Sequence, residues 1–278
     1  MNSRDREPVG VAHFSAIEAP PAEFVGLAAA AGFSRVGLRL FPAFPGAPVH
    51  SLPAGSASAR EVAARLGDTG VTLWDIEFVV IDAAFDPASH RRVLGDAAAL
   101  GARRLSVCGE DADRARLIDN FAALCALAAE FELAVDLENM GWRPVRAFSD
   151  ARAVVEAAGA PNGGVLVDAL HFFRNGGTPE QLRAAPAGMI RHVQLCDVRG
   201  PGPETDAARI AEARGGRFAP GAGELPLTGF LAALPPEAAI SVEVPIPEGV
   251  SAAAHLGRLC EAARAAIRAA GPAGGALT

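Results

Sequence analysis

Lysine and tyrosine are missing from this sequence: all 25 basic residues are arginine, and no tyrosine is present. Schiff-base aldolases and pyridoxal-phosphate enzymes form a covalent bond through a lysine amine. Both classes are therefore excluded. Without tyrosine, no phenol can act as the acid or base of a reaction.

Cysteine is scarce, and long apolar runs are absent. The four cysteines show no CxxC spacing, which excludes a zinc knuckle and a dithiol redox motif and predicts reduced, buried thiols. No apolar run approaches the roughly 18 residues that span a bilayer. The polar start MNSRDREPVG lacks the apolar segment of a signal peptide. We therefore expect a cytoplasmic protein without a membrane partner. The cysteines are Cys108, Cys125, Cys196 and Cys260.

The charge balance is acidic. A net charge of -7 and a pI near 5.4 argue against a nucleic acid as partner, because a polyanion is bound by basic surfaces. Half of the 278 residues are hydrophobic, which is ample for a large core. A chain of this length fits one large α/β domain.

Short apolar runs alternate with alanine-rich amphipathic stretches along nearly the whole chain. The runs are hydrophobic nearly throughout, as in strands buried on both faces. Eight strand–helix units predict a single (β/α)₈ TIM barrel over residues 1–278, with residues 1–8 and 271–278 flexible. A doubly wound open sheet is the rival fold, but no GxGxxG motif follows the first strand. The predicted strands are 9–14, 35–41, 71–80, 104–108, 133–138, 164–168, 192–195 and 239–244, and the predicted helices are 21–31, 59–66, 87–100, 111–131, 150–158, 179–184, 227–234 and 252–270.

Two segments are predicted to be long loops, residues 42–57 and residues 198–226. In a barrel each would follow a strand and lie on the C-terminal face, where active sites are built. Loops of this length are typically lids, interface elements or mobile segments.

Four strands in the second half end in side chains that can bind a metal ion. The last inward residue of each strand can point into one common cleft, because residues two apart share a face. Carboxylates and an amide gathered there would make a hard, oxygen-rich site for a divalent cation. The alternative for each carboxylate is an ordinary ion pair with arginine or a helix cap. The four residues are Glu138, Asp168, Gln194 and Glu243.

Two histidines lie close to these tips. His171 follows Asp168 by three residues and suits proton transfer, since imidazole titrates near neutral pH; the alternative is a histidine packed in a loop. His192 shares a strand face with Gln194 but lies about 6.6 Å deeper. A core histidine is favoured there, and a shifted register would make His192 the ligand instead of Gln194.

The first half offers weaker candidates for substrate binding. His13, Arg39 and Glu77 lie at or near the ends of the first three strands, where an ion pair or a cap is an equal alternative. The Arg39 guanidinium could hold a carboxylate or phosphate, and Glu77 could bind sugar hydroxyls. Trp142, just after Glu138, could form an apolar wall of the pocket. Arg174 and Arg217 are further candidates for binding an anionic group.

At these motifs the chain resembles the xylose isomerase-like TIM-barrel superfamily of sugar phosphate isomerases and epimerases. The matching segments are LEN, LVDALHFFRNGG, HVQLCD, RFAPGAGELPL and SVEVP. The resemblance implies one divalent ion, Mn²⁺ or Mg²⁺ with Co²⁺ or Zn²⁺ as alternatives, on Glu138, Asp168, Gln194 and Glu243. Many members have histidine where this chain has Gln194, and bacterial 3-dehydroshikimate dehydratases are among the relatives with glutamine there. Endonuclease IV matches poorly, because its histidine-rich zinc cluster is missing.

The resemblance also implies a reaction. A hydroxy-carbonyl substrate would chelate the metal, and Glu138 and Glu243 would move the proton next to the carbonyl through a metal-stabilised enediolate, with His171 assisting. We therefore predict an isomerase or epimerase of a small keto sugar or related compound. A lyase of the same fold, similar to a 3-dehydroshikimate dehydratase, is the alternative, and a non-catalytic barrel is a third. Relatives often pair, so a homodimer is also considered.

Overall fold

The computed structural model describes residues 8–44 and 46–271, and these residues form one closed parallel barrel. The strands follow one another around the barrel in sequence order, and the last strand pairs with the first through Val9 opposite Ile240. The predicted (β/α)₈ fold is confirmed. The strands are β1 (Val9–Val11), β2 (Arg35–Arg39), β3 (Thr72–Ile81), β4 (Arg104–Gly109), β5 (Ala134–Glu138), β6 (Gly163–Asp168), β7 (Ile190–Leu195) and β8 (Ala239–Val242).

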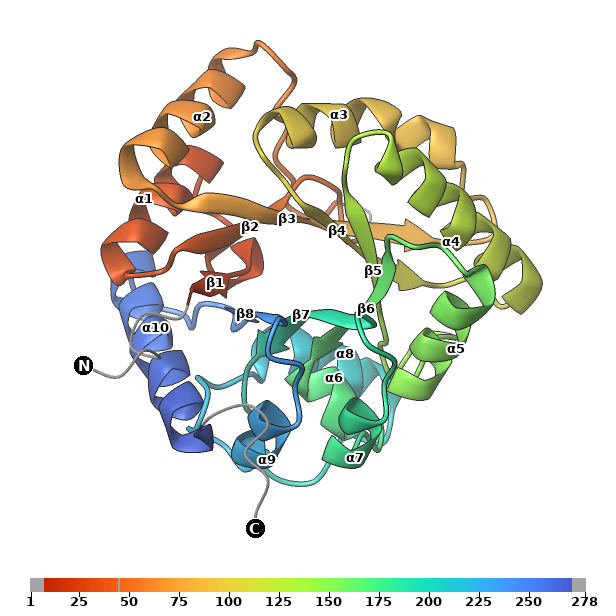
Figure 1. Cartoon of the computed structure of the whole chain (residues 1–278). Coiled ribbons are helices and arrows are strands. Elements are labelled where there is room, and N and C mark those ends of the chain that lie inside the picture. The colour runs from red at the N-terminus through yellow and green to blue at the C-terminus, as the bar shows by residue number, and fades with distance from the viewer. Residues whose placement is uncertain (1–7, 45, 272–278) are drawn as a thin grey trace.

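Helices surround the ring of strands, as the view along the barrel in Figure 1 shows. The alternation of side chains on each strand explains this arrangement. On β4, Leu105 and Val107 belong to the hydrophobic core beneath the helices, whereas Arg104 and Ser106 bond to partners inside the barrel. The helices are α1 (Pro21–Ala31), α2 (Ala57–Thr69), α3 (Arg91–Ala99), α4 (Arg114–Ala129), α5 (Phe148–Ala158), α6 (Ala169–Arg174), α7 (Pro179–Arg183), α8 (Asp206–Gly215), α9 (Leu227–Ala232) and α10 (Ala252–Ala270), with 3₁₀ turns η2 (His13–Ala16) and η3 (Pro87–His90).

The interior of the barrel is polar below its C-terminal mouth. Arg104 forms a buried ion pair with Asp136, and the Ser106 hydroxyl donates to Asp75 Oδ2 at 3.2 Å. Gly164 makes room for this arrangement, because a Cβ at that position would lie 2.7 Å from Asp136 Oδ1. We use the term interior layer for these polar side chains together with the pair His192 and Ser241, whose Nε2 and Oγ atoms lie 3.0 Å apart.

Three predicted strands end earlier than expected, and one of them is β2, which stops at Arg39 rather than residue 41. The first strand stops at Val11 rather than residue 14, because His13 begins the 3₁₀ turn η2. The last strand stops at Val242, so Glu243 lies one residue past β8 instead of inside it. Glu77 lies in the middle of β3, which runs on to Ile81.

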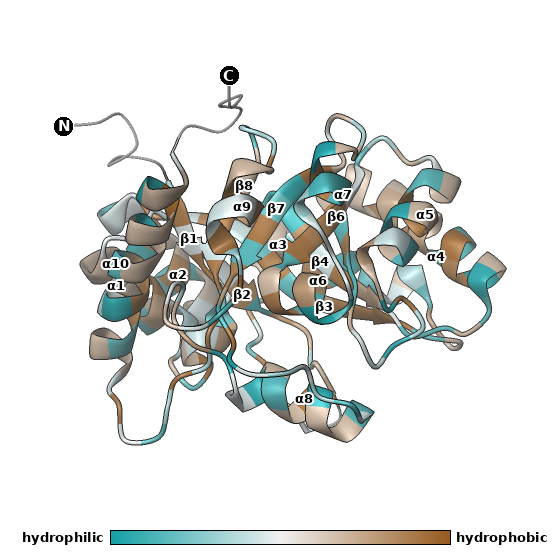
Figure 2. Ribbon diagram, turned by 90° about the horizontal axis from the view of Figure 1, so that it is seen from below, coloured by the Kyte–Doolittle hydropathy of each residue, from teal (hydrophilic) through white to brown (hydrophobic). Residues whose placement is uncertain are grey.

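The prediction that residues 198–226 form a loop is wrong for the segment that folds into α8. Thr205 caps this helix by accepting a hydrogen bond from Ala208 N at 3.2 Å, and the residues that follow are mostly good helix formers. The short helix α6 was also not expected. Figure 2 shows α8 set apart from the ring of helices, at one end of the barrel.

All four cysteines are buried and unpaired, as predicted. In the part of the chain that the structure describes, no helix is long and apolar enough to cross a membrane. The chain ends predicted to be flexible lie almost entirely outside the described residues.

Candidate active site

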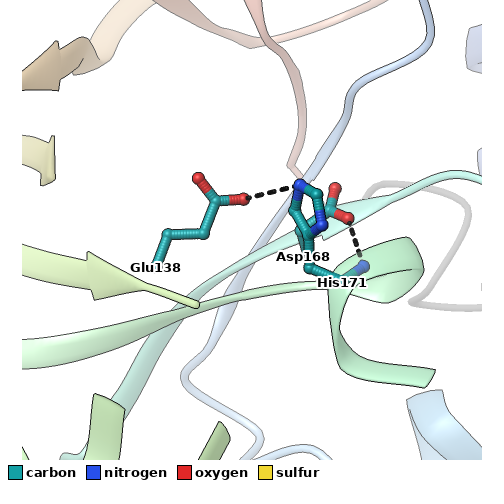
Figure 3. Close-up of side chains that lie close together, drawn as sticks. All are labelled: Glu138, Asp168 and His171. Carbon is teal, nitrogen blue, oxygen red and sulfur yellow. Dashed lines mark hydrogen bonds and ion pairs between the residues drawn. The ribbon is translucent and has the colours of Figure 1, made fainter. Parts of the chain in front are cut away.

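Two of the predicted ligands meet at the C-terminal mouth of the barrel. Glu138 is the last residue of β5 and Asp168 the last residue of β6, and both are buried. One ligand atom from each, together with one from His171, all lie within 4.8 Å of one another. Figure 3 shows Glu138 and Asp168 on either side of the His171 ring. This spacing suits three ligands of one ion.

Asp168 uses both of its oxygens. Oδ1 accepts a hydrogen bond from the backbone N of His171 at 3.0 Å and so caps α6. Oδ2 accepts from Arg217 Nη1 at 2.6 Å. The cap fixes the carboxylate in the mouth and orients His171 beside it.

Gln194 and Glu243 come from neighbouring strands. The backbone N of Glu243 continues the pairing with β7 by donating to Leu195 O at 3.0 Å. Gln194 Nε2 donates to Glu243 Oε1 at 3.3 Å. The other amide atom, Gln194 Oε1, is buried and has no hydrogen-bond partner among the described residues. A buried amide oxygen that has no hydrogen-bond donor and lies next to a carboxylate can serve as a ligand of a cation.

Arg217 joins the two sides of this cluster. Its Nη1 lies 2.6 Å from Asp168 Oδ2 and 3.1 Å from Glu243 Oε2, and its Nε donates to Ala213 O at 2.8 Å. Burial alone would lower the pKa of Arg217, but Asp168 and Glu243 raise it well above its ordinary value. The guanidinium is therefore a fixed positive charge among the carboxylates. We use the term mouth layer for Glu138, Asp168, Gln194, Glu243 and Arg217.

The carboxylates of the mouth layer repel one another. Burial, followed by the charges of Asp168 and Glu243, raises the pKa of Glu138 well above its ordinary value. Burial, opposed by Arg217, raises the pKa of Glu243 to about 7. Arg217 alone thus does not neutralise the cluster, which is the electrostatic condition for binding a divalent cation.

His171 is held as a neutral imidazole. Burial lowers its pKa to about 4, and Nε2 lies 4.0 Å from Glu138 Oε1. Its backbone oxygen accepts from Asn139 Nδ2 and Asn175 Nδ2 at 3.2 and 2.7 Å. The Trp142 ring packs edge-on against the imidazole ring of His171, with 5.1 Å between the ring centroids. These contacts aim a neutral nitrogen donor or acceptor at the Glu138 carboxyl.

His192 lies in the interior layer rather than in the mouth. Nε2 is 3.0 Å from Ser241 Oγ, and Nδ1 has no partner among the described residues. Burial lowers the pKa of His192 to about 3. The β7 residue that reaches Glu243 is therefore Gln194, which fits the predicted strand register.

The predicted residues of the first half form a separate network next to the mouth. Arg39 binds Glu77 Oε2 through both Nε and Nη2, at 3.1 and 2.7 Å. The same carboxylate accepts from the backbone N of His13 at 3.0 Å. Both His13 ring nitrogens have backbone partners, Ala19 O at 2.9 Å and Arg39 N at 3.2 Å. His13 is not among the residues that line the cavity, whereas Arg39 lines it.

Arg174 lies outside the mouth cavity. Its Nη2 pairs with Glu212 at 2.6 Å, and it also donates to the backbone oxygens of Arg199 and Gly200. These bonds tie α8 and the preceding loop to α6. Arg174 therefore helps to position α8, whose residues Ala213 and Arg214 line the mouth cavity.

The cavity at the mouth is also lined by side chains that sequence reasoning missed. Arg143 lies directly after Trp142 in the loop that follows β5, and Arg214 lies in the last turn of α8. The signal for Arg143 was its place in a loop after a ligand-bearing strand, since such loops build the active sites of barrels. Apolar side chains from the first three strand ends and the loops complete the wall. They are Phe14, Ala43, Phe44, Phe78, Met140 and Ala213.

Comparison with known proteins agrees with this geometry. A family model described as the xylose isomerase-like TIM barrel matches residues 25–268. The chain belongs to the xylose isomerase-like TIM-barrel family. The comparison with curated proteins found no match to this chain.

Three solved structures share the fold of this xylose isomerase-like barrel, each with a TM-score of 0.76. A xylose isomerase domain protein from Alicyclobacillus acidocaldarius is 22% identical, with 96% of this chain and 99% of that chain covered. The IolI protein, solved with a bound zinc atom, is 18% identical, with 94% and 98% covered. A fusion of such a barrel with 4-hydroxyphenylpyruvate dioxygenase is 21% identical over 92% of this chain, which spans only 42% of the fusion protein. Epimerases and a probable dehydratase are also among the structures with this fold.

Proposed function

We propose that this chain is a divalent-metal-dependent isomerase or epimerase of a small hydroxy-carbonyl compound such as a keto sugar. The observation that carries the proposal is the mouth layer, which combines three mutually repelling carboxylates with Gln194, whose buried Oε1 has no partner among the described residues. Glu138, Asp168, Gln194 and Glu243 would hold the ion. Mn²⁺ and Mg²⁺ prefer such oxygen ligands, and His171 also makes Co²⁺ or Zn²⁺ acceptable.

A divalent ion bound there would offset the repulsion among the carboxylates and would polarise a substrate carbonyl as a Lewis acid. The residues of the chain supply the proton transfers. In the proposed mechanism a Glu243 carboxylate oxygen removes the proton next to the carbonyl, and Glu138 protonates the opposite face or the neighbouring carbon. His171 Nε2, 4.0 Å from Glu138, relays a proton or donates a hydrogen bond to a substrate hydroxyl. Arg217 is proposed to hold substrate oxygens next to the same carboxylates.

The apolar wall supports a small substrate. Phe14, Phe78 and Trp142 line the mouth cavity, and α8 contributes Ala213 and Arg214 to the lining. Excluding water from the site strengthens each electrostatic contact inside it. The proposed setting is the cytoplasm, and the proposed partner is this small molecule alone.

A lyase reaction is the second candidate. Gln194 favours it, because glutamine at the β7 position resembles the pattern of 3-dehydroshikimate dehydratases, and a probable dehydratase of this kind shares the fold. In that case the same proton abstraction would be followed by loss of the β-hydroxyl.

Metal analysis followed by a substrate screen in D₂O tests the proposal. We expect about one divalent ion per chain, turnover that EDTA removes and Mn²⁺ restores, and deuterium in the recovered carbon skeleton. Deuterium uptake without loss of water supports the isomerase or epimerase, whereas release of water supports the lyase. A chain that binds no divalent ion under any loading condition would refute both.

A further inference from the structure

Arg143 has a hydrogen-bonding edge that no described residue uses. Its side chain is 9% exposed and lines the mouth cavity. Nη1 donates to Glu110 Oε2, and this is the only hydrogen bond of the guanidinium to the described residues. Nε is shielded from solvent and has no partner among them. Leaving a buried N–H donor unpaired is costly, so this atom indicates a missing ligand.

The free edge has the geometry of an anion site. With Nη1 turned to Glu110, the guanidinium presents Nε and Nη2 side by side. Two parallel N–H groups match the two oxygens of a carboxylate or phosphate, which is the reason arginine is favoured where these groups are bound. Glu110, whose side chain is 53% exposed, anchors the arginine from the solvent side.

The charge balance around the mouth points the same way. Arg39 pairs with Glu77, and Arg217 pairs with Asp168 and Glu243. Arg214 also lines the cavity, yet it makes no ion pair within residues 8–44 and 46–271. Its guanidinium instead lies over the Phe44 ring, 4.0 Å from the centroid. Arg214 is therefore a positive charge at the mouth that lacks a counter-charge among the described residues.

We propose that Arg143, with Arg214 as a second cation, binds an anionic group of the substrate, a carboxylate or a phosphate. This inference rests on the proposed function, because the same substrate would offer its hydroxy-carbonyl group to the mouth layer. The substrate class is thereby narrowed from neutral keto sugars to hydroxy-carbonyl compounds that carry one anionic group. Trp142, the neighbour of Arg143, lines the same cavity and can report binding by its fluorescence.

Calorimetric binding of three small probes tests the inference without any turnover. The probes are glycerate, glycerol 3-phosphate and glycerol, each titrated into the chain in EDTA and again after loading with Mn²⁺. We expect at least one of the anions to bind about tenfold or more tightly than glycerol in both conditions, since charge-assisted bidentate bonds contribute that much. The tighter of the two anions distinguishes carboxylate from phosphate. Equal binding of all three probes would overturn the inference.

Variants of two arginines in the loop after β5 test which side chain binds the anion. Arg143→Gln is expected to reduce anion affinity by about 10- to 100-fold and to leave glycerol binding unchanged. Arg146→Gln is the matched control, because that side chain is half-exposed beside Asp206 and does not line the cavity. Arg143→Lys keeps the ion pair with Glu110 and protects the fold, but it loses the paired N–H edge and should still bind the anion about tenfold less tightly. Unchanged anion affinity in Arg143→Lys and Arg143→Gln would refute the role of Arg143.

The two proposals fail in different ways. Anion binding that depends on Arg143 in a chain without metal-dependent turnover would leave this inference standing and remove the proposed function. Metal-dependent turnover of neutral keto sugars, combined with no preference for anions, would do the reverse.

Discussion

The barrel contains two polar layers, and they differ in how their charges are balanced. Residues of the two layers alternate along three strands. Asp136 stands two positions before Glu138, His192 two before Gln194, and Ser241 two before Glu243. That spacing places the pairs on the same strand face, roughly 6.6 Å apart along each strand. Both layers are buried, so burial alone does not distinguish them.

The interior layer has one carboxylate, Asp75, beyond the ion pair of Asp136 with Arg104, whereas the mouth layer has three carboxylates and one cation. Arg104 neutralises Asp136, and Ser241 bonds to His192. In the mouth layer the Arg217 guanidinium pairs with both Asp168 and Glu243, and Gln194 Oε1 has no partner among the described residues. The larger excess of carboxylates over cations in the mouth layer favours a cationic ligand there rather than in the interior layer.

The largest expected effect tests the mouth layer directly. Glu243→Gln should reduce turnover by about 10²- to 10⁴-fold, the usual contribution of a positioned acid or base, while the fold is preserved. Steady-state rates of the metal-loaded protein provide the measurement. Glu248→Gln, an exposed residue in the same loop, is the control and should have the wild-type rate. If Glu243→Gln keeps that rate as well, Glu243 takes no part in the reaction.

The interior layer should respond in stability rather than in chemistry. Asp136→Leu leaves Arg104 as an unpaired buried charge and should lower the free energy of unfolding by about 3–5 kcal/mol. The double variant Arg104→Met with Asp136→Leu should regain most of this loss, since no charge remains buried. Urea unfolding measures both, and metal content should not change. A loss below about 1 kcal/mol in the single variant would contradict the assignment.

His13 belongs to neither polar layer, so it tests how burial of a titratable side chain changes the pH dependence of stability. Burial lowers its pKa from 6.5 to about 3, so the unfolded chain binds a proton that the folded chain does not. The stability that this residue contributes is present above pH 6.5 and is lost as the pH falls below that value. Between pH 7 and pH 5 the wild type should lose about 2 kcal/mol more than His13→Gln, as measured by urea unfolding at each pH. Parallel pH profiles for the two proteins would show that His13 does not titrate this way.

The smallest effect is expected on the free energy of unfolding, and its sign should differ between the two layers. The raised pKa of Glu138 means that its ionised form destabilises the metal-free fold near neutral pH. Glu138→Gln should therefore raise the free energy of unfolding in EDTA by about 1 kcal/mol and should abolish the stabilisation by Mn²⁺. Asp136→Asn, the same kind of change one layer deeper, should lower it. Thermal unfolding with and without Mn²⁺ compares them, and a loss of stability in both variants would remove the distinction between the layers.

The sequence alone determined the fold and much of the mouth. Eight buried apolar runs alternating with amphipathic helices are compatible with few architectures, and the closed barrel was predicted with most of its strands. The ends of parallel strands meet at one face, so the residues Glu138, Asp168, Gln194 and Glu243 could be predicted to gather there. Local rules of pairing and periodicity were sufficient for these conclusions.

Tertiary structure decided the rest, because it depends on contacts between segments far apart in the chain. The bond of Arg217 to Asp168 and Glu243 joins residues separated by 49 and 26 positions, and no local pattern indicates it. The same holds for the pairing of Arg143 with Glu110, which occupies Nη1 and leaves Nε without a partner among the described residues. Which charges are neutralised and which stay available is a property of the packed mouth, and only the three-dimensional arrangement specifies it.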